Sequence, residues 1–182
     1  MKCVRSVNRA CGAGCAFLCL TLAGCSNGPF GESRIRFLLE NAAIPLNGEQ
    51  VQLSEQMFKC GELAELWEIR NLGPGRSIGK LLPAGRELKF SDDVQAGDMR
   101  LPYVQISGDF FVQLIEVHSI RDVDPMNKLV EAKVGVHITH NCFPTTVWLL
   151  GVHHGKFTED FQPRFQFQQI NDDWQYDSIT HQ

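Results

Sequence analysis

The sequence has no run of basic residues and no apolar stretch long enough for an ordinary membrane-spanning helix. Proteins that bind nucleic acid neutralise phosphate groups with clustered Lys and Arg, whereas this chain of 182 residues has a formal net charge of −4. The apolar residues 10–24 would form a helix of about 22 Å, shorter than the ~30 Å hydrocarbon core of a bilayer. We therefore expect neither a nucleic-acid partner nor a membrane span at residues 10–24.

Motifs of common enzymes are also missing. The chain has no Gly-x-Ser-x-Gly sequence, which carries the nucleophile of many serine hydrolases. In the glycine-rich stretch 71–88, five residues separate Gly73 from Gly79, where a phosphate-binding loop has four. Lys80 is then followed by Leu81, where such a loop has Ser or Thr. We therefore expect a protein that acts by binding and is not an enzyme, with no catalytic residues and no cofactor.

The first 25 residues have the pattern of an export signal. Lys2, Arg5 and Arg9 precede the apolar residues 10–24, which end in small residues. A basic start, a short apolar middle and a small-residue end are typical of a secretory signal peptide. A buried helix is a weaker interpretation, because the three glycines within this stretch each lower helix stability.

The end of this segment resembles a known family. Leu22-Ala23-Gly24-Cys25 is similar to the lipobox of bacterial lipoproteins, in which an aliphatic residue and two small residues precede a cysteine. The resemblance implies cleavage before Cys25 and a diacylglyceryl group on its sulfur. The alternative is ordinary secretion with Cys25 unmodified. Ser26 follows the cysteine, and in Gram-negative members a residue other than Asp there implies the outer membrane, with the protein on its periplasmic face.

These assignments divide the chain into three parts. Residues 1–24 are the expected signal peptide, residues 25–33 the lipidated N-terminus and tether, and residues 34–182 a single periplasmic domain. Residues 1–24 hold three of the 17 basic residues and none of the 21 acidic ones, so the mature chain would have a net charge of −7.

The cysteines left after cleavage predict a disulfide. Four leave with the signal peptide and Cys25 would carry lipid, so that Cys60 and Cys142 remain. An even number of remaining cysteines in an exported protein indicates a disulfide, because the periplasm is oxidising. In the chain-entropy model such a bond would stabilise the fold by roughly 4–5 kcal/mol. Two separate buried thiols are the alternative interpretation.

Residue periodicity predicts the following elements. Residues 34–53 alternate as strands, and Asn47-Gly48 between them is typical of a hairpin turn. Ser54 is a good N-cap for a helix over residues 55–70, with Cys60 on its apolar face. Residues 71–88 and 91–98 are expected loops. The strands expected after them are residues 109–119, 129–142, 145–152, 164–170 and 174–179, with turns at 121–127 and 171–173.

This order of elements predicts an α+β fold. An N-terminal hairpin and one main helix would pack on an antiparallel sheet of about five strands, in a meander or roll-like layout. A β-sandwich with a peripheral helix is the alternative. Either layout carries no function by itself.

Histidines near Cys142 raise the question of a metal or a catalytic thiol. Imidazole and thiolate ligands suit zinc or copper, and His137, His140 and Cys142 lie close in sequence, with His153-His154 further on. On a strand, however, His137 points to the face opposite His140 and Cys142, and a disulfide removes the thiolate. We therefore expect no metal site and no Cys–His nucleophile, with His140 a hydrogen-bonded residue at a strand end.

Five aromatic residues gather near the C-terminus: Phe161, Phe165, Phe167, Trp174 and Tyr176. Phe165 and Phe167 alternate with polar residues, which favours a core role. We expect the C-terminal sheet to pack on the helix through Trp67, and any ring that is exposed becomes an interface candidate.

Together these observations predict a lipoprotein of the cell outer membrane that serves as a protein-binding accessory or assembly subunit of the envelope. Its expected partners are the membrane, through lipid on Cys25, and another envelope protein. The alternative is a periplasmic lipoprotein that binds a small ligand or a metal.

Overall fold

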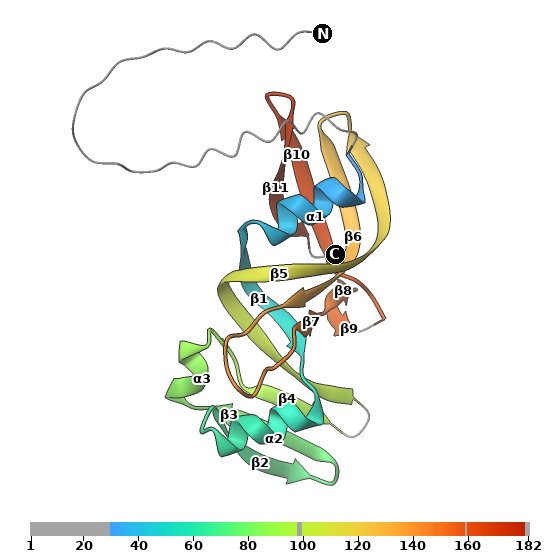
Figure 1. The fold of residues 1–182 in the computed structure, drawn as a ribbon. Helices are drawn as coiled ribbons and strands as arrows, with labels where there is room; N and C mark the ends of the chain where they lie inside the picture. Colours follow the sequence, from blue (N-terminus) through green and yellow to red (C-terminus); the bar gives the residue numbers. More distant parts are fainter. Residues whose placement is uncertain (1–29, 98–99, 159, 181–182) are drawn as a thin grey trace, which may run out of the picture.

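The computed structural model describes residues 30–97, 100–158 and 160–180 and is mostly β-structure (Figure 1). One sheet has nine strands in the order β11-β10-β6-β7-β1-β5-β4-β3-β2, and β8 and β9 form a separate hairpin. The elements in chain order are α1 (Glu32–Glu40), β1 (Ala43–Gln52), α2 (Glu55–Leu63), β2 (Trp67–Gly73), β3 (Arg76–Leu81), α3 (Pro83–Glu87), β4 (Val94–Gly97), β5 (Arg100–Asp124), β6 (Asn127–Val136), β7 (Val147–Leu149), β8 (Gly151–His153), β9 (Lys156–Thr158), β10 (Arg164–Ile170) and β11 (Asp173–Thr180).

The α+β prediction with one main helix is wrong, and so is the sandwich alternative. The pairings run continuously through a nine-stranded antiparallel sheet, and the described residues contain only three short helices. The expected long helix stops at Leu63, because Glu65 adopts a left-handed backbone (φ 55°) and Trp67 begins β2. The glycine-rich stretch expected to be a loop forms the β2–β3 hairpin, whose turn uses positive φ at Gly73 and Gly75.

The segment expected to begin as a strand is helix α1. Ile35 and Leu39 are fully buried while Phe37 is exposed. The spacing of four between the buried residues fits one face of a helix as well as one face of a strand. Ion pairs from Arg36 to Glu32 and Glu40, each one helical turn away, support the helix.

Asn47-Gly48 is not a hairpin turn. β1 runs through it and pairs with β5 on both sides, with a bulge between Asn47 and Glu49. Gly48 has φ 83°, a conformation open to glycine in a bulge as well as in a turn. Its N–H donates to the Ser107 hydroxyl at 3.0 Å, which holds the bulge on β5.

β5 is a curved strand of 25 residues that joins the two halves of the molecule (Figure 1). Its first half pairs with β1 and β4, and its second half pairs with β6. The predicted pairing of 109–119 with the strand after the 121–127 turn is therefore confirmed. β7 pairs with both β6 and β1, so that β1, β5, β6 and β7 form a closed ring of strands. Its buried side chains include Val51, Val112, Leu114, Val134, Val136 and Val147.

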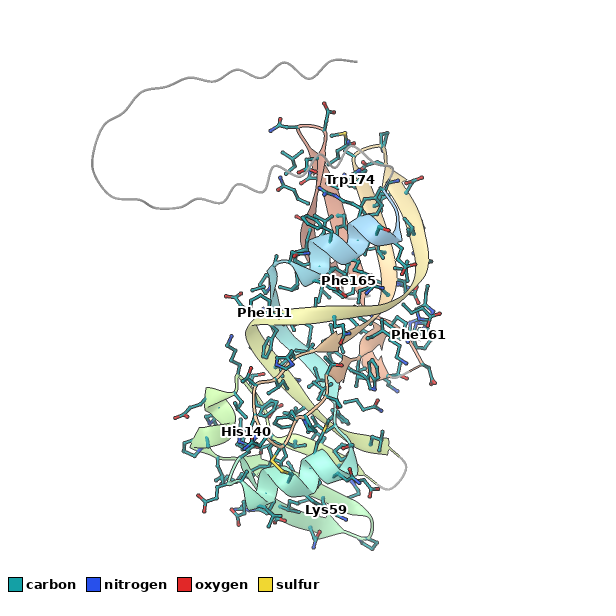
Figure 2. The ribbon with its side chains drawn as sticks, viewed as in Figure 1. Lys59, Phe111, His140, Phe161, Phe165 and Trp174 are labelled. Atoms are coloured by element: carbon teal, nitrogen blue, oxygen red, sulfur yellow. A yellow bond between two sulfur atoms is a disulfide. The ribbon has the colours of Figure 1, made fainter. Side chains whose placement is uncertain are left out.

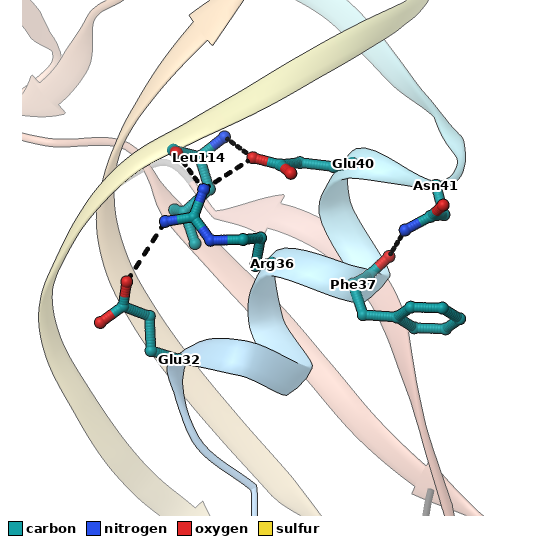
Figure 3. A network of polar contacts seen from close by, with 6 residues as sticks. All are labelled: Glu32, Arg36, Phe37, Glu40, Asn41 and Leu114. Atoms are coloured by element: carbon teal, nitrogen blue, oxygen red, sulfur yellow. Dashed lines mark hydrogen bonds and ion pairs between the residues drawn. The ribbon is translucent and has the colours of Figure 1, made fainter. Parts of the chain in front are cut away.

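Helix α1 takes the place of a strand where β1 leaves β5. Pairing with β1 ends at Phe111. Three residues further on, the N–H of Leu114 donates to Glu40 Oε1 at 2.8 Å, and Arg36 Nη1 donates to the Leu114 carbonyl at 2.7 Å (Figure 3). Arg36 also contacts Glu40 at 3.0 Å. Two side chains thus satisfy backbone groups of β5 that would otherwise form an open edge.

A disulfide and an aromatic cluster hold the opposite half together. Cys60 in α2 is bonded to Cys142 beyond β6, with 5.5 Å between their Cα atoms, which is the pairing predicted from the sequence. Ser54 caps α2 as predicted, since its side chain accepts from the Met57 N–H. Trp67 is fully buried in the same half as the disulfide. Its ring packs against the rings of Phe58, Phe90 and Phe143.

Candidate functional site

The expected lipid site lies outside the described residues. Cys25 and the predicted signal peptide precede Phe30, where the description begins. In the part of the chain that is described, no helix is long and apolar enough to cross a membrane. The lipid attachment at Cys25 therefore stays a prediction.

The histidines near Cys142 are distributed over separate places. His140 Nδ1 accepts a hydrogen bond from the Cys142 N–H at 3.1 Å, as predicted. The strand-end position predicted for His140 is wrong, because β6 ends at Val136 and His140 lies in the turn that follows. His153 and His154 lie at the β8–β9 turn, where the His153 ring stacks on Phe161 at 4.0 Å. Among the described residues, no three His, Cys, Asp or Glu side chains are grouped so that they could hold a metal ion.

The five C-terminal aromatic residues are all buried or partly buried. Phe165 and Phe167 are fully buried, as their alternation predicts. Their ring contacts are with Tyr176 and Phe30. Trp67 instead packs with Phe58, Phe90 and Phe143. Figure 2 shows Phe165 in the half with α1, away from Lys59 of α2. The expected packing partner was wrong, because the sequence did not reveal α1 or the contact of Phe30 with this sheet.

The outer face of the strand ring carries two exposed aromatic side chains. We define the β6 face as Phe111, Gln113, Lys133, Gly135, His137 and Trp148. Each is the sequence neighbour of a core residue, and the register sets Gln113 and Trp148 on either side of Gly135. The His137 N–H donates to the Phe111 carbonyl at 3.1 Å. Phe111 is 64% exposed and Trp148 is 36% exposed.

A hollow of about 250 Å³ lies at the Phe111 end of the β6 face. Lys89 lines it together with Phe111, His137 and Asp109. The Lys89 Nζ donates to the Asp109 carbonyl at 2.6 Å and lies 5.0 Å from the centre of the Phe110 ring. These contacts hold the Lys89 ammonium group at the rim of the hollow. The exposed Phe111 ring lines the same hollow.

A second hollow of about 240 Å³ lies at the Trp148 end. Lys133 Nζ lies 4.6 Å from the centre of the Trp148 ring, and Phe161 and Gln162 form another wall. That wall lies close to β8 because Gly151 has no side chain: a Cβ there would come within 2.5 Å of the Phe161 carbonyl oxygen. The second hollow thus combines an indole, a second aromatic ring and a cation.

The two hollows are neighbours along β6. His137 lines the first and Lys133 the second, and Gly135 lies between them on the same face. A Cβ on Gly135 would lie 2.7 Å from Thr146 Oγ1, so only glycine lets the chain before β7 lie this close to β6. The β6 face therefore has an aromatic ring and a lysine at each end, with the buried Gly135 and the Thr146 side chain that covers it between the two ends.

The sequence contained part of the signal for this surface. Phe111 breaks the apolar–polar alternation of β5, and Trp148 stands at an outward position between Val147 and Leu149. The sequence alone does not identify Phe111 and Trp148 as neighbours, because their proximity depends on the pairing of β7 with both β6 and β1. Comparison with known protein families, with curated proteins and with solved structures finds no match for this chain.

Proposed function

We propose that this protein is a lipoprotein anchored at the periplasmic face of the outer membrane through Cys25, and that it works by binding another envelope protein through the β6 face. The lipobox-like sequence at residues 22–25 supports the anchor. The exposed Phe111 and Trp148 on one sheet face support the binding role, since aromatic side chains on a rigid surface dominate the energetics of protein interfaces.

The shape of the β6 face favours a protein over a small molecule. Each hollow measures about 240–250 Å³, which lies below the ~300–1,000 Å³ typical of small-molecule pockets. Each hollow offers an aromatic ring and a lysine, and the exposed Gln113 pairs with Gly135 on the strand between the two hollows. Such a surface suits a partner that places one side chain in each hollow. The proposal is therefore a binding subunit and not an enzyme.

The test is site-specific photocrosslinking in intact cells of the source organism. A photoreactive residue would replace Phe111 in one variant and Trp148 in another, and Leu63 would serve as the control. Leu63 is 86% exposed at the end of α2, away from the β6 face. We expect the same crosslinked protein from both face positions and none from Leu63. No crosslink from either face position would contradict the proposal.

The captured protein then allows a quantitative test. We expect Phe111→Ala and Trp148→Ala each to weaken its binding to the purified partner about tenfold or more, as for a typical hot-spot residue. Leu63→Ala should leave the affinity unchanged. All three side chains are at least 36% exposed, so each variant should stay folded, and thermal unfolding checks this. Loss of a bound small molecule from Trp148→Ala, with partner affinity intact, would favour the small-ligand alternative.

A further inference from the structure

The end of the molecule formed by two hairpin turns exposes apolar side chains. Val123 and Met126 lie at the turn from β5 to β6 and are 59% and 46% exposed. Ile170 lies at the turn from β10 to β11 and is 42% exposed. We call Val123, Met126 and Ile170 with their two turns the hairpin end. Figure 1 shows both turns at one end of the molecule and α2 near the other.

The hairpin end is a single, ordered unit. The Gln169 N–H donates to the Met126 carbonyl at 2.8 Å, which joins one hairpin to the other. Asp124 accepts from the Met126 N–H at 2.8 Å and fixes the first turn. In the second turn Asn171 and Asp172 both have positive φ, 51° and 64°, as in the tight two-residue turns that match strand twist. The three apolar side chains are therefore presented together.

The chain reaches the expected lipid at this same end. Phe30 packs on Trp174 with 4.6 Å between the ring centres, and on Phe167 at 5.4 Å. Lys128, beside the first turn, lies over both the Phe30 and the Trp174 rings. Phe30 is five positions after Cys25, so that a fully extended chain spans at most about 18 Å between them. Lipid on Cys25 would hold the hairpin end against the bilayer surface.

The charges at the hairpin end permit contact with a neutral lipid surface. Asp122 forms an ion pair with Lys128, and Asp173 forms one with Arg34. The charged side chains at the turns outside these pairs are Arg121, Asp124 and Asp172, which together leave one net negative charge. This balance suits a zwitterionic headgroup region and disfavours an anionic one.

We propose that the hairpin end is a second membrane contact, in which Val123, Met126 and Ile170 enter the headgroup region of a zwitterionic bilayer. This rests on the proposed lipidation of Cys25. A diacylglyceryl anchor raises the local concentration of the three side chains at the bilayer, so that a contact too weak to bind alone becomes populated. The contact orients the protein, with the half that contains the disulfide directed away from the membrane.

The experiment uses the full lipidated chain in vesicles of phosphatidylethanolamine and phosphatidylcholine. Lipid occupies the Cys25 sulfur and the disulfide occupies Cys60 and Cys142, so one introduced cysteine can be labelled selectively. An environment-sensitive fluorophore is attached in separate variants at positions 123, 126 and 170, with Leu63→Cys and Leu72→Cys as exposed controls distant from the hairpin end. Spin-labelled lipids then quench fluorophores that lie at headgroup depth.

We expect quenching severalfold stronger at the three hairpin-end positions than at the two controls. Val123→Asp with Met126→Asp should reduce quenching at position 170 to the control level, whereas Leu63→Asp should leave it unchanged. A lipidated chain with equal quenching everywhere would overturn the membrane contact alone. A chain whose intact mass lacks lipid would overturn both proposals. A blue shift of the fluorophore emission without vesicles, growing with protein concentration, would indicate that a second copy of the chain covers the hairpin end. That result would also overturn the proposed membrane contact.

Discussion

Helices α1 and α2 are attached to the same sheet in different ways. α2 is bonded covalently through Cys60 to Cys142, and the Trp67 ring packs beneath it. Gly61 in α2 is essential to this fit, because a Cβ there would lie 2.0 Å from the Trp67 ring. α1 has no covalent link and instead buries Ile35 and Leu39 and bonds the β5 backbone at Leu114. Helix α2 is thus held by a crosslink and by packing on an aromatic ring, and helix α1 by aliphatic packing and edge hydrogen bonds.

This difference predicts which half of the molecule tolerates substitutions better. In the half with α2, the Trp67 ring packs against Gly61 with no spare volume. We therefore expect substitutions there to lower the free energy of unfolding most. The half with α1 ends in exposed turns and strand edges, which suit surface contacts. The following changes are expected to separate the two halves.

Removal of the disulfide should have the largest effect. Cys60 and Cys142 are 82 residues apart, and closing a loop of this size stabilises the folded state by about 4–5 kcal/mol in the chain-entropy model. Urea denaturation of Cys60→Ser/Cys142→Ser should show a loss of this size. The oxidised wild type and the same protein after reduction provide the matched pair. A loss below about 1 kcal/mol would mean that the crosslink adds little to noncovalent packing.

Truncation of Trp67 should come next. Its ring is 1% exposed, and its Nε1 donates to the Phe58 carbonyl at 2.9 Å. Trp67→Ala should lower the free energy of unfolding by about 3–5 kcal/mol, because it leaves a large cavity in the core. Trp174→Ala, at a partly buried ring in the other half, is the control and should cost clearly less. Equal losses in denaturant unfolding would contradict the proposed difference between the halves.

Loss of the hydrogen bond between Glu40 of α1 and the Leu114 N–H of β5 should have a moderate effect on stability. Glu40→Ala leaves the Leu114 N–H without its 2.8 Å partner and should destabilise the protein by about 1–3 kcal/mol. Glu62→Ala, at an exposed position on α2, should change stability by less than about 0.5 kcal/mol. Amide hydrogen exchange at Leu114 should accelerate in Glu40→Ala and not in Glu62→Ala. Unchanged protection at Leu114 would show that α1 does not shield this edge.

The smallest effect concerns Tyr176 at alkaline pH. Partial burial first, and the carboxylates of Glu49 and Asp177 next, raise the pKa of Tyr176 from 10.0 to about 12. The unfolded chain loses this proton at lower pH than the folded protein, so the contribution to stability is complete below pH 10.0 and is lost as pH rises to about 12. Melting temperatures should fall more steeply across this window in the wild type than in Tyr176→Phe. Parallel curves would contradict the shift.

The parts of the fold that follow from local signals were predictable. The Ser54 cap, the turn at Asn171-Asp172 and the β5–β6 pairing depend on residues close in sequence, and the cysteine count gave the disulfide. The errors arose where one pattern fits two structures. Ile35 and Leu39 fit a helix or a strand, and the positive φ of Gly48 fits a bulge or a hairpin turn. The β6 face could not be predicted, because it requires the closure of the strand ring by β7.

The central claim is that lipid on Cys25 tethers this protein to a membrane. Mass spectrometry of the full chain purified from membranes of the source organism tests it most directly. The account predicts a chain that begins at Cys25 and carries a diacylglyceryl group on that sulfur, and a Cys25→Ser variant without this mass. A chain that retains residues 1–24, or one that begins elsewhere with Cys25 absent or unmodified, would contradict it.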